Sequence, residues 1–193
     1  MKLLQNTKFR SEIKRFIKEH HPLDVVLFGS STSGKVSPKD VDLMVIFPEK
    51  ADLNAAHELR KTLEHIGINA QLTTKTWAGL LDPQFAAREA FLAEGYSLAH
   101  ETFLAEGLGY ANQVLFKYDL TGMGKSARMR FYYSLLGRNG PGMLAMHKAS
   151  KLSDNLVLAP VTARYAFREY FEHWKIQVLE IPVLYPSRLK GHI

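Results

Sequence analysis

Two short apolar segments that flank a polar stretch constrain the fold of this chain more than any other feature. The first ends at Phe28 and the second covers residues 41–47, and both consist mainly of Val, Leu, Ile, Met and Phe. Short, continuously apolar runs of this kind are typical of β-strands that are buried on both faces. The second run nevertheless carries Asp42 and directly follows Asp40, and side chains two residues apart on a strand point to the same face. A strand that should be buried therefore presents two carboxylates side by side.

This carboxylate pair predicts a bound cation. At about 3.3 Å per residue, the Cα atoms of Asp40 and Asp42 lie roughly 6.6 Å apart. Two charges at that distance repel by about 2.5 kcal/mol at an effective dielectric constant of about 20. Carboxylate oxygens suit Mg²⁺, an ion that proteins share with substrate phosphates. Gly29 lets the backbone approach a phosphate closely, and the Ser30 hydroxyl and neighbouring amides can donate hydrogen bonds to it.

A phosphate-binding P-loop is an alternative interpretation of the same stretch, because Gly29 to Lys35 match G-x-x-x-x-G-K after a strand. Two features disfavour it. Val36 stands where a P-loop has the Ser or Thr that reaches the magnesium ion. Pro38 follows soon after the lysine, so the sequence leaves no room for the long helix whose N-terminus binds phosphate.

The spacing of the two motifs resembles that of a known family. Gly29-Ser30, nine intervening residues and Asp40-Val41-Asp42 stand between two apolar strands. This pattern resembles the signature of the DNA polymerase β-like nucleotidyltransferase superfamily, and it is closest to that of the minimal nucleotidyltransferases. The resemblance implies an α/β (α+β) fold in which a small mixed sheet is flanked by helices.

The resemblance also implies a reaction and a set of site residues. In that family the two acids coordinate two Mg²⁺ ions, and a nucleoside monophosphate passes in line from a nucleoside triphosphate to an acceptor while pyrophosphate leaves. Carried over to this chain, Asp40 and Asp42 are the catalytic residues and the metal ligands. Gly29 and Ser30 bind the triphosphate, and Lys39 is expected to place positive charge near its phosphates. The motif names neither the triphosphate, ATP or another, nor the acceptor.

One departure from the family pattern leaves the activity open. The family's third acid lies on the next strand, where Gln71 stands in this chain and Asn69 is the next candidate. An amide oxygen ligates Mg²⁺ without neutralising its charge, so a second metal ion at Gln71 would bind more weakly. The first hypothesis is therefore an active, Mg²⁺-dependent nucleotidyltransferase. The second is a catalytically degenerate, antitoxin-like module that binds a nucleotide or a partner, as many minimal nucleotidyltransferases work beside a toxin protein.

The chain divides by composition near residue 108. Residues 1–107 carry a net charge of −1 and are expected to form the nucleotidyltransferase-like domain. Residues 108–193 carry a net charge of +7 and show a strand, a helix and a β-α-β finish, which predicts a smaller α+β domain. A basic domain of this kind can face nucleic acid or an acidic protein partner, so nucleic-acid binding is the third hypothesis.

The helix expected from about residue 126 bears on this third hypothesis. Met129, Tyr132, Tyr133 and Leu136 recur at helical spacing, so we predict that they pack into the core and do not form a base-stacking platform. The alternative is that segment 125–138 guides an acceptor strand or a protein partner.

Composition excludes several other classes of site. The chain lacks cysteine, which excludes disulfides and cysteine-based zinc sites, and its eight histidines show no zinc-binding spacing. No apolar run approaches the 18 or so residues of a membrane span, and the N-terminus lacks the apolar region of a signal peptide. We therefore expect a cytoplasmic protein with no membrane partner.

Overall fold

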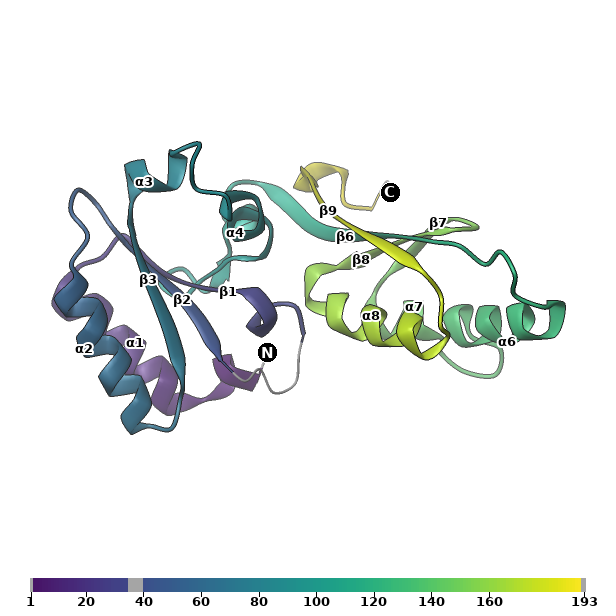
Figure 1. Cartoon of the computed structure of the whole chain (residues 1–193), viewed down its shortest axis with the longest axis horizontal. Helices are drawn as coiled ribbons and strands as arrows, with labels where there is room; N and C mark the ends of the chain where they lie inside the picture. The colour runs from purple at the N-terminus through teal and green to yellow at the C-terminus, as the bar shows by residue number, and fades with distance from the viewer. Residues whose placement is uncertain (1, 35–39, 192–193) are drawn as a thin grey trace. The chain divides into compact units, whose positions relative to one another are not determined.

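The computed structural model describes residues 2–34 and 40–191. The chain forms two compact units, Met1–Leu108 and Gly109–Ile193, and each unit contains its own β-sheet (Figure 1). The predicted mixed α+β fold is therefore confirmed. No helix among the described residues is long and apolar enough to cross a membrane.

The first unit is built on a five-stranded mixed sheet. Its strands are β1 (Asp24–Phe28), β2 (Val41–Phe47), β3 (Ala70–Thr76), β4 (Tyr96–Ser97) and β5 (Thr102–Phe103). They lie in the order β3-β2-β1-β4-β5, with β2 parallel to β3 and antiparallel to β1. The two apolar segments of the sequence are thus neighbouring strands at the centre of this unit.

Helices cover both faces of this sheet (Figure 1). They are η1 (Lys2–Gln5), α1 (Thr7–His20), η2 (Gly29–Ser31), α2 (Leu53–His65), α3 (Trp77–Leu81), α4 (Arg88–Glu94) and α5 (Leu104–Gly107). Helices α1 and α2 pack on one face through a core that includes Phe9, Leu43 and Leu63, all fully buried. The other face carries a smaller core, in which Met44 of β2 packs with Leu80 of α3 and Phe91 of α4.

The alternation of side chains along β2 determines the face on which Asp42 lies. Val41, Leu43 and Val45 belong to the core beneath α1 and α2, whereas Met44 belongs to the core beneath α3 and α4. Because side chains alternate along a strand, Asp42 lies on the same face as Met44. The burial of β2 on both faces explains why its sequence is almost continuously apolar.

The second unit is a four-stranded antiparallel sheet with helices on one side (Figure 1). Its elements are β6 (Tyr110–Tyr118), α6 (Lys125–Leu136), α7 (Met143–His147), β7 (Ser150–Ser153), β8 (Leu156–Pro160), η3 (Val161–Ala163), α8 (Arg164–His173), β9 (Val178–Pro186) and η4 (Ser187–Leu189). The strands lie in the order β7-β8-β6-β9. Aromatic rings fill the core between sheet and helices, where Phe116, Phe131, Phe167 and Phe171 are fully buried.

The sequence prediction for α6 is wrong on which residues enter this core. The helix buries Phe131 and Leu135, while Met129, Tyr133 and Leu136 are exposed to solvent. The reason is that apolar residues occur on every side of this helix, so periodicity does not choose a face. The choice is made by ring contacts: Phe131 packs against Tyr118, with centroids 5.6 Å apart.

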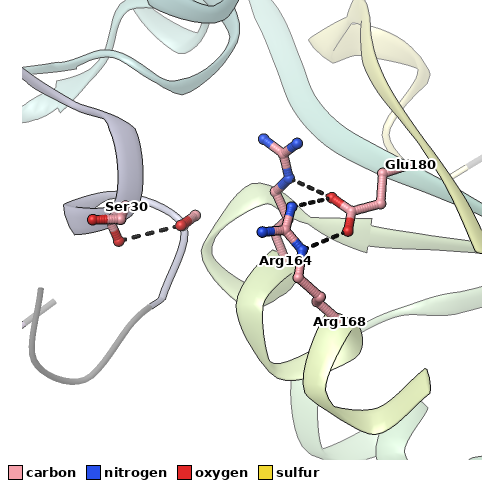
Figure 2. Close-up of polar contacts among 5 residues, drawn as sticks. Ser30, Arg164, Arg168 and Glu180 are labelled. Carbon is pink, nitrogen blue, oxygen red and sulfur yellow. Dashed lines mark hydrogen bonds and ion pairs between the residues drawn. The ribbon is translucent and has the colours of Figure 1, made fainter. Parts of the chain in front are cut away.

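Two arginines and one glutamate join α8 to the edge strand β9 (Figure 2). The Glu180 carboxylate accepts a hydrogen bond from Arg164 Nε at 2.7 Å and two from Arg168, from Nε at 2.7 Å and from Nη2 at 2.8 Å. Burial raises the pKa of Glu180, but the hydrogen bonds from Arg168 and Arg164 outweigh burial, so the pKa lies below its usual value. The charged form of Glu180 therefore stabilises the second unit.

We expect Glu180→Gln to lower the free energy of unfolding by about 2 kcal/mol at neutral pH, because an amide cancels none of the charge of two part-buried guanidinium groups. The pKa is lowered in the folded chain, so this stabilisation is present above the ordinary pKa of 4.5 and is lost as the pH falls through the folded value. Urea unfolding at pH 7 and near pH 3 tests this, with Glu169→Gln on exposed α8 surface as the control. An equal deficit at both pH values would contradict it.

Candidate functional site

The candidate site begins where β1 ends, at a glycine that no other residue can replace without disturbance. Gly29 has a φ of 71°, which L-residues rarely adopt. A Cβ atom at this position would lie 2.7 Å from Asp42 Oδ2. The backbone of the Gly-Ser turn therefore lies directly against the carboxylate of the neighbouring strand, as the register of β1 and β2 requires, since Phe28 is paired with Asp42.

The turn after Gly29 is held together by its own hydroxyl groups. Thr32 Oγ1 donates to the Gly29 carbonyl at 2.9 Å. Ser33 Oγ donates to the Ser30 carbonyl at 3.2 Å, and Figure 2 shows this bond at Ser30. Thr32 and Ser33 are buried, so these bonds are partly shielded from water. The Ser31 hydroxyl is also buried and has no hydrogen-bond partner among the described residues. The side chains of the Ser-rich stretch thus fix the turn, a role that the sequence analysis did not assign to them.

The two aspartates form a negatively charged pair beside this turn. Burial raises the pKa of Asp42, and the nearby negative charge of Asp40 raises it further. The Asp40 carboxylate is oriented by Asn69, whose Nδ2 donates to Asp40 Oδ1 at 2.6 Å. The backbone N–H of Val41 donates to the carbonyl of Asn69 at 3.0 Å, which fixes the start of β2 against the start of β3.

Gln71 lies on β3 directly beside Asp42 in the parallel register of the two strands. Paired residues of neighbouring strands project to the same face, so its amide shares the face of the two carboxylates. Asn69, just before β3, and Gln71, within it, therefore place amides beside the acidic pair. Among the described residues no group of three or more His, Asp or Glu side chains comes together. Lys39, the remaining predicted site residue, lies outside the described residues.

The residues of this site fit a divalent cation. The two carboxylates lie on one face and repel each other, and burial and the charge of Asp40 raise the pKa of Asp42. Positive charge between the two carboxylates removes this repulsion. The sequence suggested Asn69 only as a possible metal ligand. In the structure its amide nitrogen donates to Asp40 and so positions that carboxylate. This positioning role follows from the register of β2 with β3, which cannot be read from the sequence.

A mixed sheet with a Gly-Ser turn at the end of one strand and an Asp-x-Asp pair on the next is the arrangement that the sequence resemblance predicts for a nucleotidyltransferase domain. The family described as "Polymerase beta, Nucleotidyltransferase" matches residues 11–88. The predicted resemblance is therefore confirmed for this part of the chain. Members of the family typically use a divalent metal ion, in agreement with the acidic pair.

Two solved structures are similar to part of the chain. The crystal structure of a toxin-antitoxin with AMP-PNP is 18% identical to it, covers 51% of this chain and 83% of its own, and has a TM-score of 0.37. The crystal structure of a mutant of the toxin-antitoxin MntA-HpeT is 17% identical, with the same coverage and the same TM-score. No curated protein matches the chain.

Proposed function

We propose that the first unit transfers a nucleoside monophosphate from a Mg²⁺-bound nucleoside triphosphate to an acceptor. The observation that supports this most is the contact between the Gly29 backbone and the Asp42 carboxylate, with Asp40 on the same face. This arrangement places a surface for phosphate beside a surface for metal ions.

The residues of the site have separate tasks in this proposal. Asp40 and Asp42 hold the Mg²⁺, and Asn69 fixes the orientation of Asp40. The Gly29 backbone and Ser30 bind the triphosphate, with Lys39 as a further predicted contact. When bound, Mg²⁺ neutralises charge on the phosphates and favours attack by the acceptor hydroxyl. Gln71 would complete the second metal position through its amide oxygen.

A second candidate function is a degenerate transferase that binds a nucleotide or a partner without turnover. It is favoured by one observation, the presence of amides from Asn69 and Gln71 where a third acid is expected. A toxin-like protein or a nucleic acid bound by the basic residues 108–193 is the predicted partner. The domain division at residue 108 and a cytoplasmic location remain predictions as well.

Pyrophosphate release from each of the four nucleoside triphosphates, with and without Mg²⁺, separates these two functions. We expect Gln71→Asp to raise the rate about tenfold or more, because a carboxylate neutralises part of the charge of the second metal ion. Gln71→Asn, which keeps an amide, is the matched control and should not raise it. Absence of pyrophosphate release from the natural chain and from Gln71→Asp would support the binding module instead.

A further inference from the structure

Helix α6 of the second unit presents a stripe of large apolar side chains to solvent. Met129, Tyr133 and Leu136 have exposed fractions of 45%, 37% and 49%. They are spaced i, i+4 and i+7, so they lie along one side of the helix, opposite the buried Phe131 and Leu135. Single exposed apolar residues are normal, whereas three in one continuous row form an apolar patch of the kind that partners bind.

Cations border this stripe on both sides. At 100° per residue, Lys125 and Arg130 fall on opposite flanks of the row formed by Met129, Tyr133 and Leu136. Beyond the helix, the Arg138 guanidinium lies over the Tyr133 ring, 4.6 Å from its centroid. We call these six residues the α6 surface.

The segment of the sequence that contains the α6 surface carries charge of a single sign. Between Asp119 and Asp154 the sequence contains six Lys or Arg residues and no Asp or Glu. Such a surface repels a second copy of this basic chain and attracts a negatively charged partner. Both nucleic acids and acidic proteins meet that condition, so the apolar stripe has to decide between them.

The apolar stripe favours a protein. Phosphate groups and sugars make no use of exposed Met and Leu side chains, and Arg138 covers one face of the Tyr133 ring. An apolar centre with a charged rim, enriched in Met, Tyr and Arg, is the composition of a protein–protein interface. We propose that the α6 surface binds an amphipathic helix of a protein partner, with the apolar row of that helix on the stripe and its acidic flanks on Lys125, Arg130 and Arg138. This inference does not depend on nucleotidyl transfer by the first unit.

A synthetic acidic helix tests the proposal on the full chain. The probe is a fluorescent 20-residue peptide with leucines at i, i+4 and i+7 and glutamates on both flanks, measured by fluorescence anisotropy at low salt. We expect saturable binding that weakens severalfold when salt is raised into the screening range. The double variant Met129→Ser, Leu136→Ser and the single variant Arg130→Glu should each weaken binding at least tenfold. All three positions are exposed, so the variants should fold, and far-UV circular dichroism checks this.

Controls within the same unit define the outcomes. Leu179→Ser removes an exposed leucine from β9, and Arg188→Glu reverses an exposed charge in η4; both should leave peptide binding unchanged. A peptide of the same composition with its leucines scattered around the helix should not bind. Failure of the acidic peptide to bind, or an equal loss in Leu179→Ser, would overturn the proposal. Binding of a 20-nucleotide single-stranded RNA that is lost in Arg130→Glu but kept in the Met129, Leu136 double variant would also overturn it, in favour of a nucleic acid.

Discussion

The combined replacement Asp40→Asn and Asp42→Asn is expected to abolish Mg²⁺-dependent nucleotide binding and to lower pyrophosphate release by at least about 10³-fold. The amide groups keep the shape of the carboxylates and remove their charge, so the metal loses both of its anionic ligands. Asparagine at position 40 can still accept the hydrogen bond from Asn69 Nδ2, which alanine cannot. The effect therefore reports on charge and not on a collapsed site.

The same double variant should be more stable than the natural chain when no metal ion is present. The pKa of Asp42 is raised in the folded state, so its ionisation opposes folding. The penalty is absent below the ordinary pKa of 3.8 and develops as the pH rises through the folded value. At neutral pH we expect a gain of about 0.5–1 kcal/mol, a modest value because the carboxylates are partly exposed. Thermal unfolding of both proteins between pH 3 and pH 8 tests this.

Glu49→Gln is the matched control for both measurements, because it removes an exposed carboxylate just beyond the other end of β2. It should change neither nucleotide binding nor stability. A double variant that is folded and still binds nucleotide in a Mg²⁺-dependent way would show that the two aspartates are not the metal ligands. A double variant less stable than the natural chain at neutral pH would contradict the repulsion between them.

Gly29→Ala is expected to lower nucleotidyl transfer about 10²-fold while the chain stays folded. The added methyl group would stand 2.7 Å from Asp42 Oδ2, so the carboxylate has to turn away from its position. Alanine is also strained at a φ of 71°, which costs about 1–2 kcal/mol of stability. The measurement is the rate of pyrophosphate release together with urea unfolding.

Gly67 provides a control that separates strain from crowding. It has a φ of 78°, but a Cβ at this position would meet nothing within 4 Å. Gly67→Ala should therefore cost about 1–2 kcal/mol of stability from strain alone and leave the reaction rate unchanged. Equal rates in the two alanine variants would mean that the close approach of the turn to Asp42 has no part in function.

The central strands and the acidic pair were predictable because their signals are local. Strand alternation alone places Asp40 and Asp42 on one face, and the register of β1 with β2 then brings the turn to Asp42. Short apolar runs bounded by turn residues were sufficient to predict β1 and β2. The confirmed family match over residues 11–88 agrees with this part of the sequence interpretation.

Other features depend on contacts between distant segments and were not predictable. The hydrogen bond from Asn69 to Asp40 exists because β2 and β3 are parallel in one particular register. The orientation of α6 is set by the rings that meet Phe131 in the core, including Tyr118 of β6. A helix with apolar residues all around it gives no periodic signal for such a choice. The exposed stripe of α6 therefore emerged from the fold and not from the sequence pattern.

The most direct test of the central claim is calorimetric titration of the natural chain and of the Asp40→Asn, Asp42→Asn variant with each nucleoside triphosphate, with and without Mg²⁺. If the acidic pair and the Gly-Ser turn form a metal-dependent triphosphate site, at least one triphosphate binds the natural chain with Mg²⁺, binds it far more weakly without the ion, and does not bind the variant. Binding that is independent of Mg²⁺ and unchanged in the variant, or no binding of any triphosphate to the natural chain, would contradict this account.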